Sequence, residues 1–235
     1  MASALEWGSR GPGFKSRRPD HDLKMRKSYL VILLIVLIAF AVSIFVYPQM
    51  PNRIASHWNA KGEVDGYMPK FWGLFFMPFI LVFLALLFII VPRLDPLRDN
   101  IEQFRKYFDG FIILFFIFML CVHLLIVFWN KGVKISPNIF MPIGVGILFF
   151  YIGILCENTK RNWFIGIRTP WTLSSDRVWD KTHRIGAKLF KIAGIIAILG
   201  VFFRELAVWF IIVPVIFVAI CTIVYSYVEF KKEKK

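Results

Sequence analysis

Charged residues are scarce in this chain outside a few short segments, and their scarcity excludes an ordinary soluble domain. Of the 235 residues, 19% are charged and 58% are apolar, whereas soluble domains are about 45–50% apolar. The apolar residues form blocks nearly free of charge, each close to the roughly 20 residues that a helix needs to cross a bilayer. These blocks are too continuously apolar for the strands of a barrel. The sequence therefore predicts an all-α, polytopic membrane protein.

Cysteine and histidine are also rare, with three Cys and four His in the whole chain. Cys121, Cys156 and Cys221 lie in or beside apolar blocks and form no Cys-x-x-Cys pair, so there is neither a disulfide framework nor a zinc signature. The metalloprotease motif His-Glu-x-x-His and the lipase motif Gly-x-Ser-x-Gly are both missing. We expect no catalytic residues, no metal and no cofactor, and we predict that the protein is not an enzyme.

Six apolar blocks predict six membrane-spanning helices. Their expected ranges are 29–47, 71–91, 111–129, 139–156, 189–203 and 206–227. The fifth is short, and Lys188 and Lys191 at its start can extend their amino groups to the membrane surface. No small-residue cleavage site follows the first block, so we interpret it as a retained span rather than a signal peptide.

The first 24 residues differ from the rest of the chain. They are rich in Gly, Arg, Ser and Pro and have no hydrophobic periodicity, which favours a disordered extension. Met25-Arg26-Lys27-Ser28 then leads directly into the first span as a basic flank. We hypothesise that natural translation starts at Met25; the alternative is a genuine basic tail, and the intact mass of the native protein distinguishes the two.

The distribution of positive charge predicts the orientation. With both termini cytoplasmic, the segments on the cytoplasmic side hold 22 of the 29 Lys and Arg residues and those on the other side hold 6. This bias matches the positive-inside rule, which also explains the net charge of +14 without direct binding to nucleic acid. We therefore expect a multi-pass protein of the cell membrane, with membrane lipid around its helices.

A polar segment of residues 47–70 joins the first two spans and is expected outside the cell. Its Asn-Ala-Lys-Gly and Val-Asp-Gly runs predict turns, and residues 52–58 are compatible with a short turn of helix. His57, Glu63 and Asp65 match no metal-ligand spacing. We expect a loop packed by its own aromatic residues, Trp58 and Tyr67.

The longest polar interval, residues 157–188, contains three of the eight tryptophans. Ser174 or Ser175 can cap a helix whose first turn contains Asp176. Three- and four-residue spacing then places one set of side chains on a common helix face. This set is Trp179, Thr182, His183 and Gly186.

Before that helix, residues 162–171 form an extended, partly apolar segment, and its tryptophans favour the membrane surface. Pro170 disfavours a helical conformation at the preceding Thr169. Two interpretations remain open. The segment either anchors the loop at the membrane surface, or presents Arg168 and His183 as a docking surface for a cytoplasmic partner.

His123 is the main ionisable residue inside a predicted span. Such residues often mark transport paths or proton relays. The alternative is a neutral imidazole bonded to a neighbouring helix.

Two motif regions resemble those of SdpI-like membrane proteins, a family named for an immunity protein against a sporulation-delaying peptide toxin. The first region resembles the Pro…His-Trp…Gly…Asp pattern of a domain often found at the start of such proteins. Its residues here are Pro51, His57, Trp58, Gly62 and Asp65. The second region resembles the family's most specific signature, and its residues here are Asn162, Phe164, Gly166, Arg168, Thr169, Pro170, Trp171, Trp179 and His183.

The resemblance implies a membrane receptor that protects the cell from a secreted peptide toxin. It also implies a signalling role in which the toxin-engaged protein holds a transcriptional repressor at the membrane through the cytoplasmic loop. We divide the chain into the extension 1–24, an N-terminal two-helix domain 25–110 and an SdpI-like four-helix domain 111–235. The alternative function is a transporter or channel component for a small solute or peptide, with His123 lining its path.

Overall fold

The computed structural model describes residues 26–234, so the expectations for residues 1–24 lie outside the described part. Within residues 26–234, six helices are long and apolar enough to cross a membrane. They are α1 (Lys27–Val46, continued by a 3-10 turn at Tyr47–Gln49), α2 (Lys70–Leu94), α4 (Arg105–Asn130), α5 (Pro137–Asn158), α7 (Asp176–Leu199) and α8 (Ala207–Glu233). The prediction of a mostly helical protein with six such helices is confirmed.

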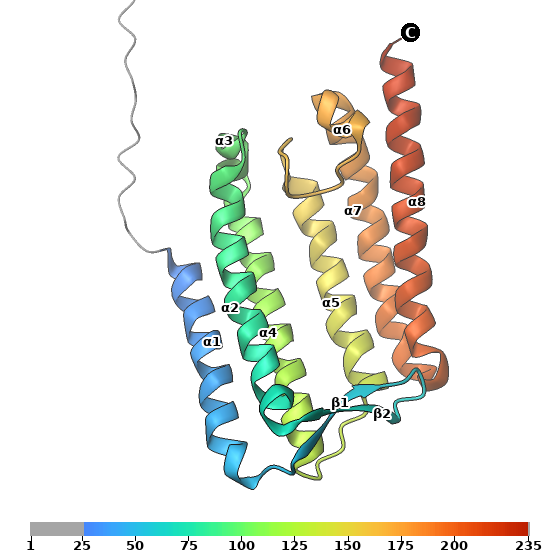
Figure 1. The fold of residues 1–235 in the computed structure, drawn as a ribbon. Helices are drawn as coiled ribbons and strands as arrows, with labels where there is room; N and C mark the ends of the chain where they lie inside the picture. Colours follow the sequence, from blue (N-terminus) through green and yellow to red (C-terminus); the bar gives the residue numbers. More distant parts are fainter. Residues whose placement is uncertain (1–25, 235) are drawn as a thin grey trace, which may run out of the picture.

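Shorter elements connect these helices. They are the strands β1 (Arg53–Trp58) and β2 (Val64–Pro69), the helices α3 (Arg98–Gln103) and α6 (Pro170–Ser174), and the 3-10 turns η2 (Gly200–Phe202) and η3 (Arg204–Leu206). In Figure 1 the long helices run up and down side by side. The β1–β2 hairpin lies at one end of the bundle, while α3, α6 and the end of α8 lie at the other.

Three boundaries differ from the sequence prediction. The helical turn expected at residues 52–58 is wrong, because this segment is strand β1, paired antiparallel with β2; the fold is therefore not purely α. The helix predicted to start at Ser174 or Ser175 and the fifth span predicted at residues 189–203 are one continuous helix, α7, which begins at Asp176. The third span also starts earlier, at Arg105.

The helices pack in two groups of three, visible in Figure 1 as α1, α2 and α4 on one side and α5, α7 and α8 on the other. The first group shares a core of large side chains such as Leu81, Phe108 and Phe116. The second group is held mainly by α5 on α7 and by α7 on α8. Helix α4 packs against α1 and α2 of its own group and also against α5 of the other group. It therefore forms the contact between the two groups.

Many large apolar side chains point away from the bundle, including Leu37 (56% exposed), Phe83 (62%) and Phe217 (58%). Soluble monomers rarely expose apolar patches of this extent. A lipid environment removes the cost of that exposure, because the hydrocarbon chains are as apolar as the side chains.

Candidate functional site

The central loop follows α5 and is built around the side chain of Asn162, which is fully buried. Its Oδ1 accepts hydrogen bonds from the backbone N–H groups of Phe164 (3.0 Å) and Ile165 (2.6 Å). Its Nδ2 donates to the carbonyls of Lys160 (2.8 Å) and Ile165 (2.9 Å). One side-chain amide thus forms hydrogen bonds with four backbone groups of a turn that lacks regular secondary structure. Asn162 therefore fixes the shape of the loop.

His183 holds the next stretch of the loop against α7. Its Nδ1 lies 2.9 Å from the carbonyl of Trp179, and its Nε2 lies 2.9 Å from the backbone nitrogen of Ile167. Because a carbonyl only accepts and an N–H only donates, the ring is neutral with its hydrogen on Nδ1. The imidazole also stacks on the Trp179 ring at 4.0 Å. Gly166 lies directly over this pair at a φ of +116°, a conformation that other residues rarely adopt.

Thr169 ends the irregular part of the loop by capping α6. Its hydroxyl accepts from the backbone N–H of Thr172 (3.1 Å), and the Thr172 hydroxyl accepts in return from the N–H of Thr169 (2.9 Å). Thr169 also bonds to the Ser226 hydroxyl on α8 (3.0 Å), and the Trp171 ring lies 5.0 Å from that of Tyr227. The predicted cap of the following helix is confirmed at Ser175, whose side chain accepts from the N–H of Val178.

The loop is also tied to the other group of helices by two residues that sequence reasoning missed. Asp95, between α2 and α3, is 2% exposed, and its Oδ2 accepts from the backbone N–H of Trp163 at 2.8 Å. Asn100 on α3 donates to the carbonyl of Arg161 at 2.7 Å. Neither position lies in a motif, and no spacing in the sequence relates it to a loop more than 60 residues away.

The nine loop residues predicted to bind a partner divide by exposure. Asn162, Thr169, Trp179 and His183 are buried, and Trp171 is half-buried. The exposed ones are Phe164, Gly166, Arg168 and Pro170. The four exposed residues can contact a partner directly. The buried residues cannot, but they hold the loop in the conformation that presents the exposed ones. The docking prediction itself stays a prediction.

At the opposite end of the bundle, the hairpin brings the first motif region together. The Nδ1 of His57 lies 2.5 Å from the Oδ1 of Asp65 across the two strands, and both side chains are exposed. Trp58 packs its ring edge-on against Trp129 of α4 at 5.3 Å. Gly62 lies in the turn beside Asn138 of α5, and Pro51 is exposed before β1.

The hairpin contacts both helix groups through two asparagines that carry no sequence signal. Asn130 at the end of α4 accepts from the backbone N–H of Ala55 (2.8 Å) and donates to its carbonyl (3.0 Å). Asn138 at the start of α5 donates to the carbonyls of Ala60 (2.9 Å) and Arg204 (2.8 Å). Like the central loop, the hairpin therefore bridges the two groups.

His123 is fully buried among α1, α2 and α4. Its Nε2 lies 3.1 Å from the hydroxyl of Ser43, which also lies within bonding distance of the carbonyls of Ala39 (3.0 Å) and Leu74 (2.8 Å). The Ser43 hydroxyl and His123 Nε2 share a hydrogen bond whose direction depends on the tautomer of the imidazole. This arrangement joins three helices.

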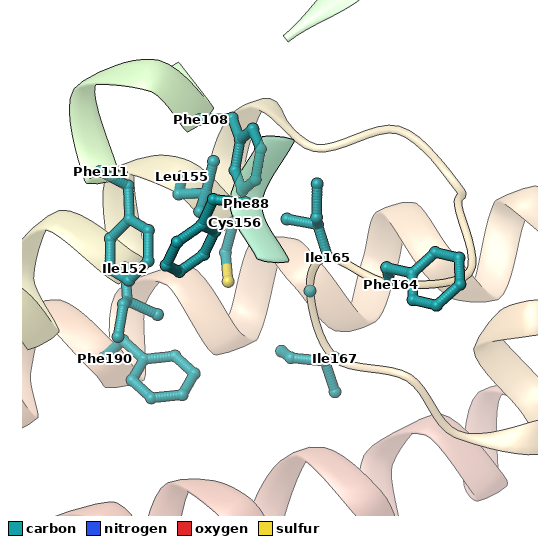
Figure 2. Close-up of a pocket in the computed structure, with 11 residues that line it drawn as sticks. Phe88, Phe108, Phe111, Ile152, Leu155, Cys156, Phe164, Ile165, Ile167 and Phe190 are labelled. Carbon is teal, nitrogen blue, oxygen red and sulfur yellow. The ribbon is translucent and has the colours of Figure 1, made fainter. Parts of the chain in front are cut away.

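An apolar cavity of about 260 Å³ lies between the two groups, under the central loop. Figure 2 shows Phe88, Phe108 and Phe111 on one side of it and the loop residues Ile165 and Ile167 on another. The remaining wall comes from α5 and α7. No three His, Cys, Asp or Glu residues within 26–234 come together as a group that could hold a metal ion.

The fold and surfaces define a class: a protein with six helices long and apolar enough to cross a membrane and with one structured polar element at each end. Comparison with known proteins then shows what the chain is similar to. Residues 158–226 match the model of the SdpI/YfhL protein family, and residues 34–82 match a domain of unknown function, DUF1648.

A curated relative extends the similarity to most of the chain. This is the immunity protein SdpI of Bacillus subtilis (strain 168), which is 26% identical over 207 residues, or 88% of this chain and 97% of the relative. The predicted resemblance to the SdpI-like family is therefore confirmed. No solved structure matches.

Proposed function

We propose that this protein is a multi-pass immunity protein of the cell membrane that recognises a secreted peptide toxin. The observation that carries the proposal is the similarity over 88% of the chain to a protein named as an immunity protein. The fold supports it, since six helices alternate in direction and leave the two family motifs at opposite ends (Figure 1). Within residues 26–234, no group of His, Cys, Asp or Glu residues that could hold a catalytic metal ion favours an enzymatic function over binding.

The proposed orientation has the hairpin outside the cell and the central loop in the cytoplasm. The beginning of α1, the central loop and the end of α8 lie at one end of the bundle (Figure 1). That end carries most of the positive charge, including exposed Lys160, Arg168 and Arg184, and the positive-inside rule directs such an end to the cytoplasm. The opposite end then meets peptides that arrive from outside.

Survival of a toxin-sensitive host tests the immunity proposal. Cells that express this protein are exposed to the sporulation-delaying peptide, beside cells with an empty vector and cells that express Gly194→Val, a variant expected to misfold. Survival with the wild type alone is the expected result. Death of cells in which the wild-type protein is inserted at normal abundance would contradict immunity to this peptide.

We further propose that the exposed face of the central loop holds a cytoplasmic transcriptional repressor when toxin is bound. Arg168 is exposed, its Nη1 donates to the carbonyl of Trp163 at 3.1 Å, and no ion pair of its own holds it in the described chain. It is therefore available to an acidic group of a partner. Arg168→Ala should abolish toxin-dependent recruitment of the repressor to membranes, whereas Arg204→Ala at the other end should not. Equal recruitment by both variants would contradict this role of the loop.

A further inference from the structure

The two edges of the β1–β2 hairpin differ in whether another part of the protein forms hydrogen bonds with them. On the β1 edge, the side-chain amide of Asn130 accepts from the N–H and donates to the C=O of Ala55. These are the two bonds that a neighbouring strand would make, so Asn130 closes this edge. Proteins commonly cover or blunt strand edges because free backbone groups recruit further strands.

The β2 edge has no such cover, and strand geometry shows which groups it offers. Because both backbone groups of Ala55 point toward Asn130, its pair with Tyr67 is a non-hydrogen-bonded one. The N–H and C=O of Tyr67 consequently point away from β1, and no other segment within residues 26–234 supplies them with a partner. The pairing is irregular at His57 and Gly66, so the regular alternation of backbone groups runs from Tyr67 toward Pro69. Pro69, which lacks an N–H, ends the row.

The side chains along this edge are accessible as well. Tyr67 is 55% exposed, and the guanidinium carbon of Arg53 lies 5.8 Å from the centre of its ring. Trp72, which is 52% exposed, follows at the start of α2. The inward-facing side of the hairpin is fixed differently, because Ile54 packs on Gly73 without exposure. The hairpin is therefore anchored on its inner face and along β1, and open along β2.

We propose that the outer edge of β2, from Tyr67 to Pro69, binds an extended segment of the toxin peptide as a third strand. This inference rests on the proposed function for the identity of the peptide. Backbone groups spaced at the strand repeat are complementary to the backbone of an extended peptide, and strand addition is a common mode of peptide recognition. The few free groups give the peptide its position, and apolar contact with Tyr67 adds affinity.

Disulfide cross-linking tests the geometry. The protein, with Cys121, Cys156 and Cys221 replaced by Ala, carries Tyr67→Cys or Pro69→Cys and is mixed with sporulation-delaying peptides that each contain one cysteine. A third strand predicts that the peptide partners of the two sites lie two residues apart. Arg53→Cys on β1 and Lys61→Cys in the turn are matched controls that should cross-link weakly. Strongest cross-links at the controls, or peptide partners three to four residues apart as in a helix, would overturn the proposal.

A backbone variant separates the edge from the side chain. Tyr67→Pro removes an outward N–H that the hairpin does not use and should weaken peptide binding about five- to tenfold more than Tyr67→Ala. Equal effects would overturn strand addition.

Disulfides between two copies of the Tyr67→Cys protein, formed without peptide, would show that a second copy occupies the edge. This result would also overturn the proposal. If the wild type protects cells while these tests fail, the docking mode is wrong and the immunity proposal stands; without binding or protection by the wild type, both fail.

Discussion

The two groups of helices are held together by opposite means. In α1, α2 and α4, bulky side chains such as Phe108 and Phe116 fill the space between helices that stay apart. In α5 and α7, the backbones meet: a Cβ added to Gly146 would lie 2.6 Å from the carbonyl oxygen of Gly194, and one added to Gly194 would lie 2.5 Å from that of Gly146. Small residues permit such close packing in membranes, where no hydrophobic effect drives helices together. The second group therefore tolerates less change than the first.

The largest loss is expected from Gly194→Val. The added side chain cannot fit against the backbone of α5, so α5 and α7 must separate along their whole contact. We expect no folded protein after detergent extraction, measured by size-exclusion chromatography. Ile195→Val, at a neighbouring position that is 51% exposed, should behave as the wild type; a folded Gly194→Val protein would contradict the close packing.

A smaller loss is expected in the other group. Phe116→Ala leaves a cavity among α1, α2 and α4, and comparable substitutions cost about 3–5 kcal/mol in soluble cores. The variant should fold but unfold at a lower temperature in a thermal melt, because neighbouring aromatic side chains can relax into the space. Ile117→Ala, at a position 45% exposed, is the control. If Phe116→Ala abolishes folding as completely as Gly194→Val, the claim that the second group of helices tolerates less change than the first is contradicted.

Ser43→Ala should cost about 1–3 kcal/mol, because it leaves buried polar groups of His123 and Leu74 without a partner. The double variant with His123→Leu should recover part of this loss if the role of His123 is structural. Unfolding in detergent measures both. If His123→Leu instead leaves stability unchanged and removes protection against toxin, His123 has a functional role that the packing does not explain.

The smallest effect on stability is expected from Asp95→Asn, at the link between the groups. An amide can accept only through its one oxygen, so it cannot serve both Leu97 and Trp163 as the carboxylate does. The variant should retain the thermal stability of the bundle within about 1–2 kcal/mol while hydrogen exchange at Trp163 and Phe164 accelerates. Unchanged exchange would mean that Asp95 does not hold the loop.

The features that can be predicted from the sequence are those with a local, repeated signal. The six apolar blocks, the cap at Ser175 and the helix face containing Trp179 and His183 all follow from composition and spacing. The hairpin was missed because a two-stranded unit is marginal alone, and its stability here comes from Asn130, distant in sequence. The burial of Asn162 and His183 was also inaccessible, since a polar residue can be buried only when a specific fold provides its partners.

Labelling in intact cells tests the central claim, that the two motif regions face opposite sides of the membrane. In the protein with Cys121, Cys156 and Cys221 replaced by Ala, Tyr67→Cys should react with a membrane-impermeant maleimide in intact cells. Arg168→Cys should react only after the membrane is permeabilised. Labelling of Arg168→Cys in intact cells with protection of Tyr67→Cys would contradict the orientation, and with it the proposal that the hairpin meets a secreted peptide.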